Sequence, residues 1–479
     1  MTHSDEPQAG AAASRQELLR RLPAVHEALA RPSVAAWEGR LSRFARTQAV
    51  REGLSVLREE VQSGAGEEAL AEPHVEAALQ EALGRAARRG IRRVINATGV
   101  IIHTNLGRAV IPPAALQAVC EELQGYVNVQ ASLETGQRSR RDEVIEGLLQ
   151  EITGCEAATV VNNNAAATLI CLSTLAAGRE VIVSRGQLVE IGGSFRIPEV
   201  MEQSGAILRE VGTTNKTHLR DYEQAIGGQT GLLLRVHPSN YRITGFTEQV
   251  PLADLVALAR RHNLPVMDDI GSGLLVDLAA RGFPEEPTAP ASIAAGADVC
   301  CFSADKLVGS CQGGLIIGRT ELVQRIRQNP LARALRVDKI TLMLLEATLE
   351  LFLDEQALFV ANPTLRMLMA DPAETKRRAQ ALARALRRAA PGLEVALQAD
   401  TSRLGSGSLP EEPLPTTVIA LTPPDGNADA LLEALRQAEP PVFARIGEDR
   451  VLLDPRTVLP GEERPLVSAV AWAVQRCAS

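Results

Sequence analysis

The chain has 479 residues, of which 45% are hydrophobic and 23% charged, and its formal net charge is −8. This length predicts two to four domains with ample core, and the negative charge argues against a protein covered throughout by a nucleic-acid-binding surface. The sequence lacks an apolar run of the ~18 residues that span a bilayer and a basic-then-apolar leader, so we expect a cytoplasmic protein with no membrane association. Seven cysteines without a CxxC pair predict reduced thiols and no bound metal.

The N-terminal part has the pattern of a helical domain with a basic surface. Between residues 14 and 58, apolar residues recur mostly at three- and four-residue spacing, as on one face of a helix. The same segment carries nine arginines against four glutamates, a local charge of +5. We therefore expect an N-terminal helical domain over residues 1–70 and a linker helix over residues 71–94. Charge alone fits a solvated helix face as well as a nucleic-acid surface.

A site-lining loop and an α/β domain are expected next. Residues 94–110 mix apolar residues with glycines, asparagines, His103 and Arg108, which is typical of a loop beside a site. Beyond residue 150, short apolar runs alternate with segments of helical length; the expected strands are 156–161, 180–184, 206–211, 232–236, 265–269, 298–302 and 314–318. This alternation predicts a large domain over residues 95–340, with a seven-stranded, mainly parallel sheet and helices on both faces.

Three strand ends in this domain carry chemical groups. Asn163, Asn164 and Ala165 follow the first strand and open a helix, whose N–H groups can hold a phosphate. Asp269 ends another strand, where a carboxylate can face a ring nitrogen. Lys306 follows the 298–302 strand, where partial burial lowers the pKa of an amine and makes it nucleophilic. Pyridoxal 5'-phosphate (PLP) requires these three parts together, although each alone is also an ordinary helix cap or loop residue.

The last third of the chain predicts a smaller domain. Residues 320–345 have a helical pattern that includes Arg333 and Arg336, three residues apart and so on one helix face. Long Leu/Ala-rich helices follow, and then strand-like runs at 392–397, 416–421, 441–446 and 450–453, with a hairpin turn over residues 446–450. We expect an α+β domain over residues 341–479, of the kind that closes over a cofactor.

At the level of motifs, the sequence resembles the bacterial selenocysteine synthases, the L-seryl-tRNA(Sec) selenium transferases, which are PLP enzymes of fold type I, the aspartate-aminotransferase fold type. The resemblance covers about residues 90–460. It is carried by INATGVIIHTNLGRA (95–109), VVNNNAAAT (160–168), SRGQLVEIGGSFRIPEVM (184–201), VGTTNKTH (211–218), SNYRITGF (239–246), DIGSGLLVDL (269–278), FSADKLVGSCQGGLIIG (302–318), NPLARALRVDK (329–339) and GSGSLP (405–410).

The resemblance implies a role for each matching residue. Lys306 would be the Schiff-base lysine and the acid/base at the α-carbon, and Asp269 would pair with the pyridine nitrogen. The cofactor phosphate would be held by Asn163, Asn164, Ala165 and Ser303. Selenophosphate would be held by four arginines, whose planar forks suit an oxyanion: Arg108, Arg141, Arg333 and Arg336. Arg141 would be contributed across a subunit interface.

The resemblance also implies the reaction and the partners. Such an enzyme converts seryl-tRNA(Sec) to selenocysteinyl-tRNA(Sec) for selenoprotein synthesis, by PLP-dependent β-elimination of water and addition of selenium from selenophosphate to aminoacrylyl-tRNA. The N-terminal helical domain would bind the tRNA. The family is homo-oligomeric, and members with this domain typically form decamers built as pentamers of dimers.

Some residues depart from the family pattern, and two other functions stay open. Residues 309–313, Gly-Ser-Cys-Gln-Gly, stand where the family has Gly-Gly-Pro-Gln-Ala. This change places Cys311 near the site. Its thiol is either structural or in contact with selenium, and we favour the structural role. Ala304 replaces a glycine and Gln187 a glutamate. One alternative is a related PLP-dependent lyase for a small phosphorylated sugar acid or amino acid, whose known relatives lack the N-terminal helical domain. The other is a tRNA-binding protein without catalysis, which would not need Lys306.

Overall fold

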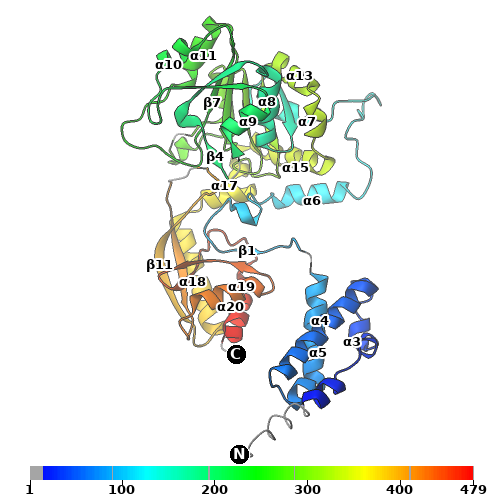
Figure 1. Ribbon diagram of the computed structural model, residues 1–479. Coiled ribbons are helices and arrows are strands. Elements are labelled where there is room, and N and C mark those ends of the chain that lie inside the picture. Colours follow the sequence, from blue (N-terminus) through cyan, green and yellow to red (C-terminus); the bar gives the residue numbers. More distant parts are fainter. Residues whose placement is uncertain (1–14, 89, 193–194, 285, 409–411, 478–479) are drawn as a thin grey trace, which may run out of the picture. The chain divides into compact units, whose positions relative to one another are not determined.

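The computed structural model describes residues 15–88, 90–192, 195–284, 286–408 and 412–477 (Figure 1). The chain forms two compact units, Met1–Arg93 and Val94–Ser479. The first fourteen residues of the expected N-terminal domain lie outside the described part, as do residues 193–194 and 409–410 of two family-like stretches. None of the described helices is both long enough and apolar enough to cross a membrane.

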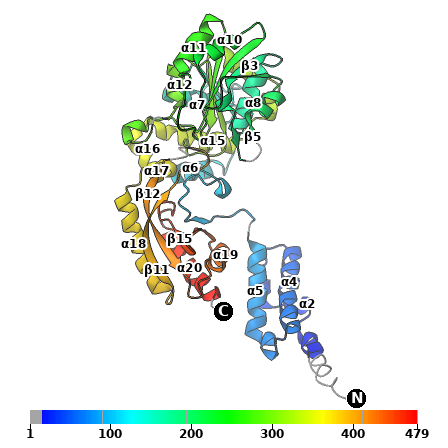
Figure 2. The same cartoon turned by 60° about the vertical axis from the view of Figure 1, so that its left-hand side comes forward.

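The first unit is helical. Its two long helices, α4 (Arg43–Gln62) and α5 (Glu72–Ala87), lie side by side in both views (Figures 1 and 2). Leucines from both helices are buried in one core, which the shorter elements complete: α2 (Val25–Leu29), α3 (Pro32–Ala35) and η1 (Glu67–Leu70). The structure therefore places α5 inside the core of the first unit, where the sequence predicted a linker helix.

The second unit is built on a seven-stranded sheet, as predicted. Its order is β2-β10-β9-β8-β7-β3-β6, and β10 runs antiparallel to both neighbours while the other pairs are parallel. The strands are β2 (Ala157–Val161), β3 (Glu180–Ser184), β6 (Ile207–Val211), β7 (Thr230–Val236), β8 (Val266–Gly271), β9 (Val299–Ser303) and β10 (Gly314–Gly318). Every residue of β2, β8, β9 and β10 is buried, which explains why their sequences are mostly apolar; Asp268 and Asp269 of β8 are the charged exceptions.

Helices cover both faces of this sheet (Figures 1 and 2). One face carries α8 (Asn164–Leu175), α9 (Ile197–Gln203) and α13 (Thr320–Gln328). The other carries α7 (Glu143–Thr153), α10 (Leu219–Ala225), α11 (Leu252–Arg261) and α12 (Ala289–Ala294). The short elements are β4 (Glu190–Ile191), β5 (Phe195–Arg196), η2 (Thr104–Leu106), η3 (Arg185–Gln187), η4 (Ala279–Arg281) and α6 (Pro113–Glu122).

The helical pattern predicted over residues 320–345 is interrupted twice in the structure. The structure has three helices there, α13, α14 (Leu331–Ala334) and α15 (Lys339–Leu349). Pro330 has no N–H to donate and holds Asn329 in an extended conformation, so α13 ends before it. The Asp338 carboxylate then caps α15 by accepting from the N–H groups of Ile340 and Thr341, at 2.7 and 3.1 Å.

The rest of the second unit forms the predicted α+β part. Its sheet has the order β11-β12-β15-β14, and α18 packs on β11 and β12. The predicted hairpin turn lies between β14 and β15, where Glu448 and Asp449 have positive φ. The elements are η5 (Glu350–Leu353), α16 (Glu355–Ala361), α17 (Pro363–Leu368), α18 (Pro372–Ala389), β11 (Glu394–Ser402), β12 (Leu414–Thr422), α19 (Ala428–Gln437), β13 (Val442–Phe443), β14 (Arg445–Gly447), β15 (Arg450–Leu453) and α20 (Glu463–Cys477).

The segment before Arg108 is bound to this C-terminal part. Strand β1 (Ile95–Asn96) pairs with β13, and the N–H of Ile102 donates to the carbonyl of Leu404 at 2.7 Å. The Ser406 hydroxyl donates to the carbonyl of Ile102, also at 2.7 Å. The loop that carries Arg108 is therefore held by hydrogen bonds to the C-terminal part.

Candidate active site

The cofactor residues expected from the sequence line one cavity of about 570 Å³, termed here the Lys306 pocket. It lies where β7, β8 and β9 end, at the carboxyl edge of the sheet, where α/β folds place their sites. From the predicted set it contains Arg108, Asn163, Asn164, Ala165, Asp269, Ser303 and Lys306. The structure thus brings together residues from four separate stretches of the chain.

Lys306 is almost completely buried, three residues after the end of β9. The turn that carries it is fixed by backbone hydrogen bonds, from the Leu307 N–H to the Ser272 carbonyl at 3.1 Å and from the Gly309 N–H to the Lys306 carbonyl at 3.0 Å. Burial lowers the pKa of the lysine, and the charge of Arg108 lowers it further, while Asp269 and Asp305 act in the opposite direction. The amine is therefore biased toward its neutral, nucleophilic form.

Asp269 lies in β8 and is buried beside the same cavity. Its carboxylate accepts from the Asn164 amide and from the Thr168 hydroxyl, both at 2.9 Å. Burial raises the pKa of this carboxyl group, and the two hydrogen bonds counteract the rise because they stabilise the anion. The carboxylate is thus prepared to face a cationic partner in the pocket.

Sequence reasoning missed Thr168 as a functional residue. It lies four residues after Asn164, so both side chains share one face of α8 and reach Asp269 together. That spacing is the signal that was available in the sequence. The spacing could be interpreted only with the knowledge that Asp269 of β8 lies next to this face of α8.

The start of α8 forms a cradle with free N–H groups. The Asn163 side chain caps the helix by accepting from the Ala166 N–H at 2.8 Å, and the first residues of the helix line the pocket, where the positive end of the helix favours an anion. Gly314 allows the neighbouring strand to approach, because an added Cβ would lie 2.1 Å from the Asn163 carbonyl oxygen. The Asn164 Oδ1 and the Ser239 Oγ are buried in the pocket wall without a hydrogen-bond partner. The Ser239 hydroxyl can donate to an anionic ligand, whereas the Asn164 oxygen can accept from a donor group of a ligand.

Arg108 enters the pocket from the loop bound to the C-terminal part. Its backbone has φ +65°, a left-handed conformation that non-glycine residues rarely adopt and that is often found at functional sites. Its guanidinium group lies 2.7 Å from the carboxylate of Asp305, the residue next to Lys306. This ion pair fixes the arginine beside the lysine.

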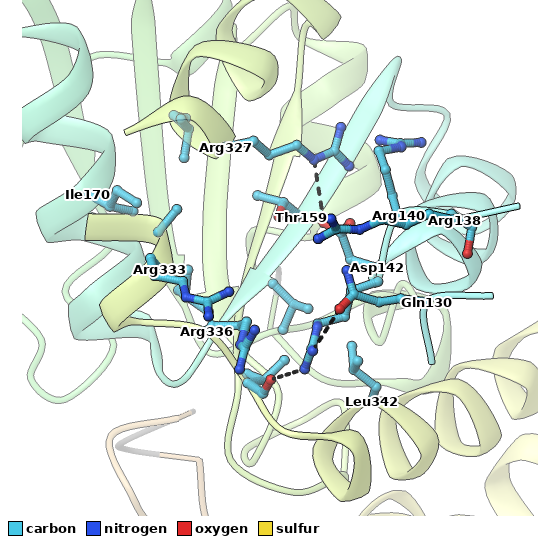
Figure 3. A pocket seen from close by; sticks show the side chains of 17 residues that line it. Gln130, Arg138, Arg140, Asp142, Thr159, Ile170, Arg327, Arg333, Arg336 and Leu342 are labelled. Carbon is cyan, nitrogen blue, oxygen red and sulfur yellow. Dashed lines mark hydrogen bonds and ion pairs between the residues drawn. The ribbon is translucent and has the colours of Figure 1, made fainter. Parts of the chain in front are cut away.

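The other three predicted anion ligands lie elsewhere. Arg141, Arg333 and Arg336 line a second cavity of about 360 Å³, the arginine pocket (Figure 3). Figure 3 shows Arg333 and Arg336 on one side of it and Arg138 and Arg140 on the other. The expectation that Arg108 and these three arginines hold one anion is therefore not met within a single copy of the chain.

The arginines of this cavity fall into two groups. Arg140 and Arg327 pair with Glu146, and Arg327 also lies 3.4 Å from Asp142. In contrast, among the described residues no carboxylate lies within 4 Å of the guanidinium groups of Arg141, Arg333 and Arg336. Burial lowers the pKa of Arg141, and repulsion from Arg336 and Arg333 lowers it further. Asp338 acts in the opposite direction on Arg141, but none of the three cations is paired with a described carboxylate, which makes this cavity a strong candidate for an anion site.

Comparison with known proteins identifies the family. Residues 94–459 match the family described as L-seryl-tRNA selenium transferase. The chain belongs to this family. It is 50% identical over 428 residues to the L-seryl-tRNA(Sec) selenium transferase of Nitratidesulfovibrio vulgaris, covering 89% of this chain and 91% of the relative. It is 48% identical over 464 residues to that of Moorella thermoacetica, covering 96% and 98%.

A solved structure shows the same fold at lower similarity. The D-glucosaminate-6-phosphate ammonia-lyase structure superposes with a TM-score of 0.56 at 21% identity, covering 81% of this chain and 98% of the lyase. The expected fold class, an α/β protein with a mainly parallel seven-stranded sheet, is confirmed.

Two departures from the family pattern have structural explanations. The Cys311 thiol lies 3.6 Å from the Thr341 carbonyl oxygen and packs against the core, and burial raises its pKa to about 11. It therefore stays protonated at neutral pH, which agrees with the structural role favoured from the sequence. Gln187 is buried, and its side-chain oxygen accepts from the Val236 N–H at 3.1 Å, a bond that a glutamate oxygen would also make.

Proposed function

We propose that this chain converts seryl-tRNA(Sec) to selenocysteinyl-tRNA(Sec), using selenophosphate as the selenium donor and PLP as the cofactor. Family membership supports the reaction. The observation that carries the assignment to these residues is that Lys306, Asp269 and the start of α8 line one cavity.

The Lys306 pocket has the groups that PLP requires. The phosphate would be held at the start of α8 by Asn163, Asn164 and Ala165, with the Ser303 hydroxyl beside them. Asp269 would face the pyridine nitrogen, and Lys306 would carry the aldehyde carbon. When bound, PLP supplies an aldehyde that condenses with amines and a ring that accepts electrons from the α-carbon.

The chain's own groups then move protons at defined atoms. The Lys306 amine, with its lowered pKa, takes the proton from the seryl α-carbon and delivers a proton to the departing hydroxyl group, which leaves as water. Asp269, whose anion is stabilised by hydrogen bonds from Asn164 and Thr168, would favour a protonated ring nitrogen when PLP is bound. Selenium from selenophosphate would then add at the β-carbon, which the elimination has left electron-poor. Its bond to phosphorus breaks by addition of water so that phosphate leaves, and Lys306 returns a proton to the α-carbon.

The arginine pocket is the proposed selenophosphate site. Arg141, Arg333 and Arg336 offer guanidinium forks without carboxylate partners, and an oxyanion would relieve their mutual repulsion. Because Arg108 lies in the Lys306 pocket, we propose that the arginine pocket of one subunit meets the Lys306 pocket of another. The chain between α6 and α7 loops outward with exposed Tyr126 and Leu133, as expected of a segment that contacts a second copy (Figure 1).

Assembly and tRNA binding complete the proposal. A dimer is the smallest assembly that joins the two pockets, and we propose the pentamer of dimers that the family resemblance implies. The N-terminal unit would bind tRNA(Sec). Its exposed cations without a carboxylate within 4 Å, in the described part of the chain, include Arg43, Arg51 and Arg58.

The test is a transfer assay that varies the substrate. Purified protein with PLP and selenophosphate is given seryl-tRNA(Sec), ordinary seryl-tRNA or free serine, and the product amino acid is assayed for selenium. We expect selenium on tRNA(Sec) only. Bound PLP without selenium transfer, together with ammonia release from a small phosphorylated amino sugar acid, would favour the lyase instead.

Mixing two inactive variants tests the shared site. Lys306→Ala lacks the reactive amine and Arg336→Gln lacks an anion ligand, so each homo-oligomer should be inactive. Subunits mixed under dissociating conditions and reassembled should regain activity, because one intact site can form between unlike subunits. If oligomers shown to contain both variants recover no activity, each active site must be built from the two pockets of a single subunit.

A further inference from the structure

The turn that carries Lys306 is anchored from the side that faces away from the pocket. Lys306 and Gln312 line the pocket, while residues 307–310 between them are buried in the core. The place of the lysine amine therefore depends on the groups that hold this buried segment, and two polar side chains from other elements or from the segment itself do so.

The first anchor is Asn362, which joins α16 to α17 and is completely buried. Its side-chain amide donates to the Val308 carbonyl at 2.9 Å. Its side-chain oxygen caps α17 by accepting from two N–H groups of the first turn, at 3.1 and 3.3 Å. The approach is close, because a Cβ added at Gly309, which has φ +75°, would lie 2.5 Å from both terminal atoms of the Asn362 side chain. One side chain thus connects the Lys306 turn to α17.

Helix α17 is itself fixed in the core. Five of its six residues are buried. The buried Arg456 donates from one nitrogen to the carbonyls of Met367 and Ala370, at 2.9 and 3.0 Å, and from another to the Pro415 carbonyl of β12, at 2.7 Å. Asn362 therefore holds the Lys306 turn against a base that is bonded to the C-terminal sheet.

The second anchor is Ser310, which bonds to α15. Its hydroxyl group is buried and donates to the Thr348 hydroxyl at 3.1 Å and to the Leu344 carbonyl at 3.3 Å. Thr348 in turn donates to the same carbonyl at 2.7 Å, so its oxygen is available to accept from Ser310. The family motif has glycine in place of Ser310, and glycine cannot make these bonds.

The two anchors bear on the chemistry through the lysine alone. Asn362 and Ser310 lie outside the described lining of the pocket, so neither would touch the substrate. A displacement of about 1 Å at a reacting group can lower a rate about 100-fold. We propose that Asn362 and Ser310 are positioning residues, which hold the Lys306 amine within reach of the PLP aldehyde and of the seryl α-carbon. This inference rests on the proposed function and adds to it two residues that act through Lys306.

The experiment removes each anchor in the full-length protein loaded with PLP. Asn362→Ser keeps an oxygen that can cap α17 and lacks the amide donor, and Ser310→Ala lacks the hydroxyl group. Thr364→Val is the local control, since Thr364 is buried in α17 and its hydroxyl has no partner among the described residues. Leu431→Ala is the stability control, because Leu431 is buried in the separate core around α19.

Three readouts separate positioning from folding. They are kcat and KM for seryl-tRNA(Sec), the melting temperature, and the fraction of PLP that borohydride attaches permanently to Lys306, measured from the mass of the labelled peptide. Asn362→Ser and Ser310→Ala should each lower kcat about tenfold or more, with KM within about twofold of wild type, because the substrate contacts are unchanged. The labelled fraction should fall in both.

The controls should behave differently. Thr364→Val should match the wild type in all three readouts. Leu431→Ala should lower the melting temperature because it leaves a cavity, yet keep kcat and the labelled fraction when assayed well below that temperature.

Two results would overturn the inference. One is a kcat within twofold of wild type in both anchor variants; if Asn362→Ser does not fold, Ser310→Ala decides by the same measure. The other is an equal loss of kcat in Leu431→Ala, which would trace the effect to stability. Labelling of Lys306 needs no selenium donor, so a wild-type protein that is labelled but transfers no selenium would refute the proposed function, while a reduced labelled fraction in the anchor variants would still support the positioning role.

Discussion

Replacing Thr168 by valine isolates the support of Asp269. The hydroxyl group donates to the Asp269 carboxylate at 2.9 Å, in a site where both residues are buried, so no water replaces the lost donor. A hydrogen bond to a charged group contributes about 1.5–3 kcal/mol, and valine has nearly the shape of threonine. If that energy is used to keep the carboxylate ionised in the transition state, kcat/KM should fall about 10- to 150-fold.

The assay is the pH profile of selenium transfer together with the absorption of bound PLP. Without the Thr168 donor the pKa of Asp269 rises further, so the acidic limb of the kcat/KM profile should move to higher pH. Thr174→Val is the matched control, because Thr174 bonds its own helix carbonyl four residues back, at 2.6 Å in α8, but does not bond Asp269. A Thr168→Val protein with the wild-type profile and rate would refute this account of Asp269.

Other substitutions test the remaining parts of the two pockets. Gly273→Ala, at φ +73°, places a Cβ 2.2 Å from the Ser303 carbonyl oxygen and should weaken PLP binding at least tenfold in a spectroscopic titration; Gly227→Ala, in open space, should not. Arg108→Gln removes a charge that lowers the pKa of Lys306, so the rise of activity with pH should shift upward; an unshifted profile would contradict that role. Arg333→Lys keeps the charge but loses the fork and should raise the KM for selenophosphate about tenfold with PLP absorption unchanged; an unchanged KM would contradict the assigned anion site.

The sheet was predictable because strands that are buried on both faces have mostly apolar sequences. A strand such as β9 is covered on both faces and is therefore apolar from Val299 to Phe302, with a segment of helical length before it. The lysine and aspartate of the pocket were predictable for a related reason. They stand at strand ends, and parallel strands bring their carboxyl ends to one edge of the sheet.

The features that were missed depend on contacts between distant segments. Pro330 and Asp338 are local signals that interrupt the helical pattern over residues 320–345, yet the apolar period runs across both. Thr168 acquires a role only because β8 lies below α8. The division of the arginines between two pockets depends on where separate segments lie in the fold, which local sequence patterns do not reveal. The packing of α5 against α4 likewise depends on a tertiary contact that a helical pattern alone leaves open.

The most direct test of the central claim is the selenium content of the amino acid bound to tRNA(Sec) after incubation with PLP and selenophosphate. Wild-type protein and Lys306→Ala are compared at equal concentration, with circular dichroism to show that both are folded. The account predicts selenocysteine on tRNA(Sec) with the wild-type protein and none with Lys306→Ala. Selenium transfer by the folded Lys306→Ala protein at the wild-type rate would contradict the claim that this lysine carries the chemistry.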